Sequence, residues 1–378
     1  MSLARDIADL ASVTTRLDTV GGSEGALNNR NLMYNPKIEI AQRGTSFSYS
    51  SGQSTNLLDR WHVPIGSGYN FDTTISQSTT VPTGEGFKYS LKVEMDAAIT
   101  PSGSENGGIG MKFEGQDFNQ LAYGTSAAKS LTLSFWVRSN KTGVYCCQIH
   151  TNAADSTSGN KYQHVKEYTI SVANTWEKKT LTFSGLTTQA ITQTNTDGFR
   201  MLWWLSVGPD DRVATADTWT QSASYLSTSN QVNFADSASN EWYLTGVQLE
   251  VGDTATDFEH RTFGDELARC QRYYYRKGGD PDGNYAPAAI AYLTSAIQLS
   301  VAHPVQMRAN PSVSVDGNIR AVDGQTSHIS SGASITNISQ KDTLAWYTSG
   351  GHSGMTQYRM YIINGQTSAN YMEVDAEL

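Results

Sequence analysis

The stretch Ser130–Arg138, SLTLSFWVR, alternates strictly between two kinds of side chain. Its odd-numbered positions from 131 to 137 hold Leu, Leu, Phe and Val, whereas its even-numbered positions from 132 to 138 hold Thr, Ser, Trp and Arg. A period of two is typical of a β-strand that buries one face in a core. The stretch therefore predicts a half-buried strand with Trp136 and Arg138 on its outer face.

Similar runs recur along the chain between long polar turns rich in Gly, Ser, Thr and Asn. They are FKYSLKVEM (87–95), EYTISV (167–172), WEKKTLTF (176–183), FRMLWWLSV (199–207) and EWYLTGVQLEV (241–251). Many short strands separated by polar turns are typical of a β-sandwich. No alternation of strands with helices is present, so doubly wound α/β folds and (β/α)₈ barrels are excluded.

Composition excludes several functional classes. The 378 residues carry 27 Lys and Arg against 36 Asp and Glu, a net charge of −9, which disfavours binding to nucleic acid. Aromatic residues make up 10% of the chain, enough for a sizeable core, so a disordered chain is excluded. The longest strongly apolar run, Met201–Leu205, is far shorter than the roughly 20 residues of a membrane helix, so no membrane insertion is expected. The N-terminus has no secretory signal pattern, which predicts synthesis in a cytoplasm.

Two short helices interrupt the β pattern. Apolar residues spaced from Leu3 to Leu17 predict an N-terminal helix that ends at Gly21 and Gly22. FGDELARCQRYYYR, with acids first, bases last and two glycines beyond, predicts a linking helix. Further alternating pairs beyond it, such as Ile297/Leu299 and Met372/Val374, predict a second β domain. The expected segments are 1–30 for an N-terminal helix, 31–262 for the sandwich, 263–276 for the linking helix and 277–378 for a smaller C-terminal β domain.

Several phrases of the sequence, in order, resemble bacteriophage tail fibre proteins, especially those of marine and cyanobacterial phages. They are NRNLMYNPKIEIAQRGTS (29–46), LLDRWHV (57–63), FEGQDFNQLAYGTSAAKSLTLSFWVRSNKTG (113–143), EYTISVANTWEKKTLTFSG (167–185) and WYLTGVQLEVGDTATDFEHRTFGDELARCQRYYYR (242–276). The strands within them also resemble jelly-roll sandwiches of the carbohydrate-binding-module type. The resemblance implies an all-β jelly roll in a virion component that contacts the host surface, usually as a homotrimer.

The ends of the chain depart from a long fibre. The N-terminal helix is short for a shaft, and no long coiled-coil or collagen-like repeat follows it. We therefore expect a compact subunit that is attached to other tail or capsid proteins through residues 1–30. The three tyrosines 273–275 cover nearly all sides of the predicted helix end, and we expect a threefold assembly to bury them.

Glycan recognition needs an aromatic ring that stacks on the C–H side of a sugar and polar groups that reach its hydroxyls. Trp136 and Arg138 share the outer face of one strand. One of the two adjacent tryptophans in FRMLWWLSV should leave the main core, and we expect it to be Trp204. Trp219 lies with Tyr225 in a long polar loop, where it could contact a ligand or pin the loop to the body. Core or interface packing remains the alternative for each tryptophan.

Two further tryptophans, Trp176 and Trp242, stand at the start of strands of the jelly-roll framework, and we interpret them as structural.

Motifs of the common catalytic and metal sites are absent from the sequence. The seven histidines are scattered without zinc spacing, and no GxSxG or Walker-type loop occurs. Jelly rolls of the resembled type often hold a structural Ca²⁺, but no DxDxDG loop identifies one here. Three cysteines, two of them adjacent, give no disulfide framework. We expect no cofactor and no enzymatic activity.

Three functions remain open at this point. The leading hypothesis is a homotrimeric tail fibre of the virion that binds host-surface glycan without cleaving it. The second is a virion decoration or adaptor subunit without receptor binding. The third is a tailspike that depolymerises glycan with two carboxylates far apart in the sequence.

Overall fold

The computed structural model describes residues 29–50, 56–64, 71–152, 161–222, 225–278, 284–324, 326–330, 335–348, 350–365 and 370–378. The chain divides into two compact units, Met1–Arg261 and Thr262–Leu378. The N-terminal helix predicted between Leu3 and Gly22 lies outside the described residues. No helix in the described part of the chain is both long and apolar enough to cross a membrane.

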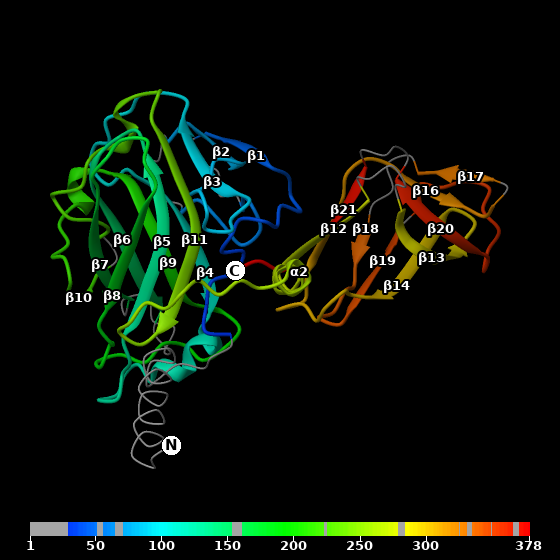
Figure 1. Ribbon diagram of the computed structural model, residues 1–378. Helices are drawn as coiled ribbons and strands as arrows, with labels where there is room; N and C mark the ends of the chain where they lie inside the picture. Colours follow the sequence, from blue (N-terminus) through cyan, green and yellow to red (C-terminus); the bar gives the residue numbers. More distant parts are fainter. Residues whose placement is uncertain are drawn as a thin grey trace, which may run out of the picture. The chain divides into compact units, whose positions relative to one another are not determined.

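The first unit is built from two antiparallel sheets that face each other (Figure 1). One has six strands in the order β1-β2-β3-β11-β5-β8, and the other has five in the order β10-β7-β6-β9-β4. The strands of the six-stranded sheet are β1 (Ser46–Tyr49), β2 (Thr73–Ser78), β3 (Ser90–Met95), β5 (Leu131–Ser139), β8 (Glu177–Phe183) and β11 (Glu241–Val251). Those of the five-stranded sheet are β4 (Asn106–Glu114), β6 (Gly143–Asn152), β7 (Lys161–Ile170), β9 (Asp197–Val207) and β10 (Trp219–Gln221). Three 3₁₀ turns join them: η1 (Gly115–Leu121), η2 (Pro209–Asp211) and η3 (Phe234–Asp236).

The connectivity of this unit is that of a jelly roll. Four strands of one sheet, in the order β3-β11-β5-β8, face four strands of the other, in the order β7-β6-β9-β4. The chain crosses between the sheets at every connection from β3 to β11 except β6 to β7 and β9 to β10, which stay within the five-stranded sheet. Eight strands in two interlocked Greek keys define the jelly-roll sandwich. The predicted all-β fold class is confirmed.

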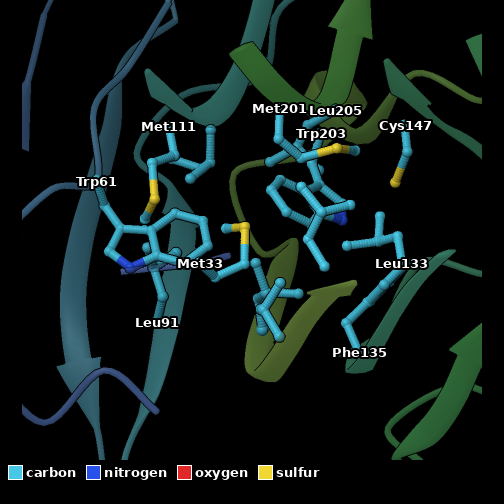
Figure 2. Close-up of a cluster of buried hydrophobic side chains, with 14 of the residues drawn as sticks. Met33, Trp61, Leu91, Met111, Leu133, Phe135, Cys147, Met201, Trp203 and Leu205 are labelled. Carbon is cyan, nitrogen blue, oxygen red and sulfur yellow. The ribbon is translucent and has the colours of Figure 1, made fainter. Parts of the chain in front are cut away.

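The core of the sandwich follows from the alternation in the sequence. Leu133 and Phe135 of β5 are fully buried, as are Trp203 of β9 and Trp61 of the segment before β2. The rings of Trp61 and Trp203 lie 5.7 Å apart, and Phe135 meets Trp203 edge-on at 5.8 Å. Figure 2 shows these rings with methionine and leucine side chains filling the space between the sheets. Trp242, which the sequence assigned to the framework, lies in the same core.

The second unit combines one helix with two antiparallel sheets. It begins with α2 (Phe263–Gln271), whose first turn is capped by the Thr262 hydroxyl accepting from the Asp265 N–H. A three-stranded sheet follows the order β12-β21-β15, and a seven-stranded sheet follows β17-β16-β20-β13-β14-β19-β18. The strands are β12 (Tyr274–Gly278), β13 (Asn284–Leu293), β14 (Ala296–Ala302), β15 (Ser312–Val315), β16 (Ile319–Val322), β17 (Ser327–Ile329), β18 (Ile335–Asn337), β19 (Thr343–Thr348), β20 (Met360–Gly365) and β21 (Tyr371–Asp375). Its core is separate from that of the sandwich and includes Trp346, Tyr361 and Met372.

The linking helix is shorter than the predicted 263–276. It ends at Gln271, and from Tyr274 the chain is β12, paired with β21. Tyr273, Tyr274 and Tyr275 are all buried within this chain. The Tyr274 hydroxyl donates to Glu373 Oε1 at 2.7 Å, and the Tyr275 hydroxyl lies 2.7 Å from His303 Nδ1. The expectation that a threefold assembly buries these rings is corrected, because the second unit covers them within the single chain.

Candidate functional site

The outer face of the six-stranded sheet carries a group of aromatic and charged side chains, which we call the aromatic patch. The antiparallel register sets Arg138 of β5 opposite Tyr243 of β11, and Tyr243 opposite Lys92 of β3. Residues opposite each other in antiparallel strands project from the same face. Trp136, two residues before Arg138, therefore projects from this face as well. The patch consists of Lys92, Trp136, Arg138, Trp176, Glu241 and Tyr243.

A bulge in β11 fixes the position of the patch along the strand. The register with β5 shifts between Thr245 and Gln248, where Gly246 has a φ of +58°. A Cβ at Gly246 would lie 2.5 Å from a ring carbon of Phe87, so glycine is required there. The bulge keeps Tyr243 and Thr245 on the outer face while Val247 and Leu249 return to the core.

Tyr243 is the buried centre of the patch. The guanidinium carbon of Arg138 lies 4.8 Å from its ring centroid, and Lys92 Nζ lies 5.8 Å from it. Trp176 meets the same ring edge-on at 6.1 Å. The Tyr243 hydroxyl donates to Glu241 Oε2 at 2.9 Å. Contacts on several sides hold this ring rigidly in place.

Trp136 differs from the other patch aromatics because its ring is half-buried and has no partner. In the part of the chain that the structure describes, it makes no hydrogen bond, ion pair or ring contact. Directly across the sheet lie Thr245 on one side and the exposed Lys178 on the other. An indole with an open N–H on a flat sheet face can stack on a ligand and also donate a hydrogen bond to it.

Arg138 is held beside Trp136 by the loop before β8. Its Nε donates to the Asn174 carbonyl oxygen at 3.0 Å, and its Nη2 donates to Asn174 Oδ1 at 3.1 Å. The stack on Tyr243 and these two bonds fix the guanidinium plane. Arg138 therefore presents a preorganised donor next to the open indole.

The patch carries two basic groups, Lys92 and Arg138, and one acid, Glu241, and the neighbouring Glu94 balances them. Lys92 Nζ lies 2.9 Å from Glu94 Oε2 and 2.8 Å from Glu241 Oε1. Partial burial disfavours the Lys92 ammonium, but hydrogen bonds to Glu241 and Glu94 outweigh it and raise the pKa of Lys92. Burial likewise acts to raise the pKa of Glu241, yet hydrogen bonds from Lys92 and Tyr243 lower it overall. Both groups are therefore ionised at neutral pH, and the patch offers donors and acceptors together.

Trp204 leaves the main core, as the sequence predicted, but its ring is not accessible. It is 3% exposed and packs with Leu202, Val207 and Leu226 against the outer face of the five-stranded sheet. Its indole Nε1 donates to Gln148 Oε1 at 3.0 Å. The segment around Leu226 covers this ring, so the expectation of a stacking platform at Trp204 is corrected.

Trp219 pins its loop to the body, which is one of the two alternatives that the sequence left open. Its ring meets His164 edge-on at 5.1 Å and Tyr123 at 5.9 Å, and its Nε1 donates to the Ser184 carbonyl oxygen at 2.7 Å. Tyr225 is 37% exposed, and its carbonyl oxygen accepts from Gln148 Nε2. The structure thus keeps Trp136 and Arg138 together and places Trp204, Trp219 and Tyr225 on the other sheet.

Sequence reasoning missed Tyr243 and Lys92 and assigned Trp176 to the framework. The alternation in EWYLTGVQLEV does separate Tyr243 from the core-facing Trp242. The pairing register that brings Tyr243 beside Arg138 joins strands more than a hundred residues apart, and local pattern contains no signal for it.

The outer face of the five-stranded sheet holds buried polar groups. Burial, with the nearby Arg200 and Lys161, lowers the pKa of His150 to about 3. His150 Nε2 and Gln163 Nε2 are buried without a hydrogen-bond partner in the described residues. His150 and Gln163 are covered by other segments of the same chain, and they present no accessible aromatic surface.

No cluster of three or more His, Cys, Asp or Glu side chains suited to a metal ion occurs among the described residues. The three cysteines are free and buried, and burial raises the pKa of Cys146 to about 11, which suppresses its thiolate. Burial also raises the pKa of Asp211, beside Asp210 in η2. Adjacent carboxyls in one turn do not face each other across a groove as glycoside hydrolysis requires.

The second unit contains a polar hollow of about 250 Å³ between β15, β16 and β18. Ser314, Asn318, Ser330 and Ile335 are among its lining residues. The lining holds neither an aromatic ring nor a charged side chain, so it lacks the stacking surface of the aromatic patch.

Comparison with known proteins gives fold neighbours of low similarity. No protein-family model and no curated protein matches the chain. The enzymatically active domain of tailspike protein 4 from bacteriophage CBA120 is 13% identical over 59% of this chain and 21% of that chain, with a TM-score of 0.30. The CBM22-2 xylan-binding domain of Xyn10C from Paenibacillus barcinonensis is 14% identical over 55% and 98%, with a TM-score of 0.29. The C-terminal family 22 carbohydrate-binding module of Xyn10B from Clostridium thermocellum is 11% identical over 60% and 98%, with a TM-score of 0.31.

Proposed function

We propose that this chain is a non-enzymatic glycan-binding subunit of a virion, a phage tail fibre that attaches to host-surface glycan through the aromatic patch. One observation carries the glycan-binding part: the half-buried ring of Trp136, which has no hydrogen-bond or ring partner among the described residues, lies two residues from the fixed guanidinium of Arg138 on the outer face of the sheet. A pyranose stacked on Trp136 would place its hydroxyls within reach of the Arg138 guanidinium.

A flat platform of this kind favours weak individual sites. The aromatic patch is an open sheet face and not a deep pocket, so a single site would release its ligand readily. Several subunits that engage one surface would improve the apparent affinity by roughly 10²–10⁴ through multivalency. Weak sites summed over copies suit reversible attachment to a cell surface.

The tail fibre assignment, the homotrimer and the attachment through residues 1–30 rest on the resemblance of the sequence phrases to tail fibre proteins. Sedimentation of the purified chain should give a mass near three times 41.2 kDa. Imaging of virions with this subunit labelled should place it at the tail. A labelled subunit confined to the capsid surface, together with unchanged host binding after its removal, would instead favour a decoration or adaptor role.

Affinity electrophoresis through gels that contain host-surface polysaccharides tests the glycan-binding part. We expect one or more polysaccharides to retard the wild-type chain, and Trp136→Ala to reduce that retardation about 10-fold, since the stacking surface is lost. Tyr225→Ala is the matched variant, because this exposed aromatic lies on the other sheet and should have no effect.

Loss of retardation in Tyr225→Ala but not in Trp136→Ala would move the site to the five-stranded sheet and contradict the proposal. Incubation of the wild-type chain with a retarding polysaccharide should leave its viscosity and reducing-end content unchanged. A fall in viscosity would favour the depolymerising tailspike.

A further inference from the structure

One face of the seven-stranded sheet in the second unit exposes large apolar side chains. Met360 is 65% exposed and Ile362 is 49% exposed on β20, while the intervening Tyr361 is buried in the core. The register sets Ile290 of β13, 40% exposed, opposite Met360 and sets Val322 of β16 opposite Ile362. All four side chains therefore share the outer face.

The same surface extends beyond these two pairs. Ile329 of β17, 44% exposed, lies opposite Arg320, which shares this face of β16 with Val322. Tyr358, two residues before β20, is 72% exposed and adjoins Ile290, since its N–H donates to the carbonyl oxygen of Ala291 at 2.6 Å. We call Ile290, Val322, Ile329, Tyr358, Met360 and Ile362 the apolar strip.

The exposed area is unusual for a surface that faces water. At their exposed fractions these side chains present on the order of 600 Å² of mainly apolar surface, which is at the upper limit for the largest patch on a typical monomer. It is also most of the roughly 800 Å² that each partner contributes to a stable protein interface. The exposed polar side chains of Gln298 and Ser300 on the neighbouring strand β14 would supply a rim.

The lack of charged residues in the apolar strip limits the kinds of surface that could cover it. None of its six residues is charged; of the charged side chains nearby, Arg320 lies on the same face of β16 and is half-buried, and Arg359 is paired with Asp323 at 3.0 Å. Where copies of one surface meet around a symmetry axis, a net charge on that surface meets its own sign, so a surface with this little charge suits self-association in a chain of net charge −9. A glycan would find few hydrogen-bonding groups there, since the tyrosine hydroxyl is the polar group that these side chains supply.

We propose that copies of this chain pack against one another through the apolar strip. The inference rests on the self-association in the proposed function and is independent of its glycan binding. It assigns the contact between copies to the C-terminal unit, whose residues do not include the aromatic patch.

Sedimentation of the full chain over a range of concentrations tests the assignment. The Met360→Glu/Ile362→Glu variant should dissociate to 41.2 kDa units at concentrations where the wild type is assembled, with association weakened by ~100-fold or more. Both side chains are exposed in the single chain, so the variant should keep its circular dichroism. Val172→Glu/Val213→Glu is the matched control, because it replaces two exposed valines of the sandwich and should assemble as the wild type does.

An unchanged mass for the folded Met360→Glu/Ile362→Glu variant would overturn the strip as the contact while leaving a homotrimer intact. A wild type that stays monomeric at high concentration would overturn both the contact through the strip and the homotrimer. Binding of that monomer to lipid vesicles or to another virion protein through the strip would count against the proposal in the same way. The effect of Trp136→Ala on glycan retardation is measured separately and tests the glycan site whatever the mass of the chain. If the double glutamate variant fails to fold, the milder Ile290→Ser/Ile362→Ser pair decides by the same criterion.

Discussion

The outer faces of the six-stranded and seven-stranded sheets are built by the same alternation but carry opposite chemistry. The aromatic patch is a network in which Tyr243 contacts Arg138, Lys92, Trp176 and Glu241. The apolar strip consists of five exposed side chains and the half-buried Val322, which form no such network among the described residues. Polar groups fixed beside an open ring suit a hydroxyl-rich ligand, whereas uncharged apolar side chains suit another protein surface. The difference shows that sheet architecture leaves the class of partner to the outer-face residues.

The largest expected difference is between substitutions on the inner and outer faces of the seven-stranded sheet, measured by their effect on the free energy of unfolding. Trp346 of β19 is fully buried, and its Nε1 donates to Met372 Sδ at 3.2 Å. Trp346→Ala should destabilise the second unit by about 3–5 kcal/mol because it leaves a large cavity. Met360→Ser on the other face should change the free energy of unfolding by less than about 0.5 kcal/mol at dilutions where the chain is monomeric. Urea unfolding followed by circular dichroism measures both. Similar losses in the two variants would contradict the assignment of inner and outer faces.

The sandwich should be sensitive to mild acid. Burial, with Lys166 adding to it, lowers the pKa of His164 to about 4, and burial also lowers the pKa of His150 to about 3 and that of His62 well below its usual value. Below pH 6.5 these histidines bind protons in the unfolded chain but stay neutral in the folded chain. The free energy of unfolding therefore falls as the pH decreases. Each histidine should lower the free energy of unfolding by about 2 kcal/mol between pH 7 and pH 5.

Guanidinium unfolding of the wild type and of His164→Phe at these two pH values measures this sensitivity. Phenylalanine can occupy the position between Phe183 and Trp219, so the variant should lose the part of the acid sensitivity due to His164. Equal stability of the wild type at pH 7 and pH 5 would show that these histidines are not buried in the neutral form.

Replacement of an arginine by lysine should weaken glycan binding at the aromatic patch but not beside the apolar strip. Arg138→Lys keeps the charge but loses the guanidinium contact over the Tyr243 ring and the two bonds to Asn174, so it should weaken glycan retardation about 3-fold to 10-fold. Arg359→Lys makes the same replacement beside the apolar strip and should leave retardation unchanged. Equal retardation of the wild type and Arg138→Lys would remove the guanidinium from the binding site.

The smallest effect concerns the ion pair within the patch. Because the pKa of Glu241 is lower in the folded chain, its contribution to stability is present above the ordinary carboxyl pKa and is lost as the pH falls through the lowered value. Glu241→Gln should therefore cost less than about 1 kcal/mol at pH 7 and almost nothing near pH 3. Denaturation of both chains at the two pH values gives the comparison. A cost that does not depend on pH would show that the carboxylate charge is not the source.

Local alternation predicts the inner and outer faces of individual strands well. The four odd-numbered positions of Leu131–Val137 are all buried in the core. Where both faces of a strand are apolar, however, alternation does not show which face is buried. Met360 and Ile362 alternate as core residues do, yet Tyr361 and Ile363 are the ones inside. The choice depends on which face meets the rest of the core, and a period of two does not contain that information.

The candidate site could be predicted only in part. The alternation places Trp136 and Arg138 together, and it separates Trp204 from the main core. It does not show that Leu226 covers Trp204, because that contact depends on the path of a long loop. The end of α2 was misjudged for a related reason: β12 forms because β21, almost a hundred residues later, pairs with the tyrosines.

The indole N–H signals of the protein give the most direct test of glycan binding at the aromatic patch. In a ¹⁵N-labelled sample the 8 tryptophans give up to 8 indole signals, and Trp136→Phe identifies the one from Trp136. Titration with a polysaccharide fragment that retards the chain should shift the Trp136 signal in a saturable manner and leave those of the buried Trp203 and Trp242 in place. A fragment that binds while the Trp136 signal stays fixed would contradict the account.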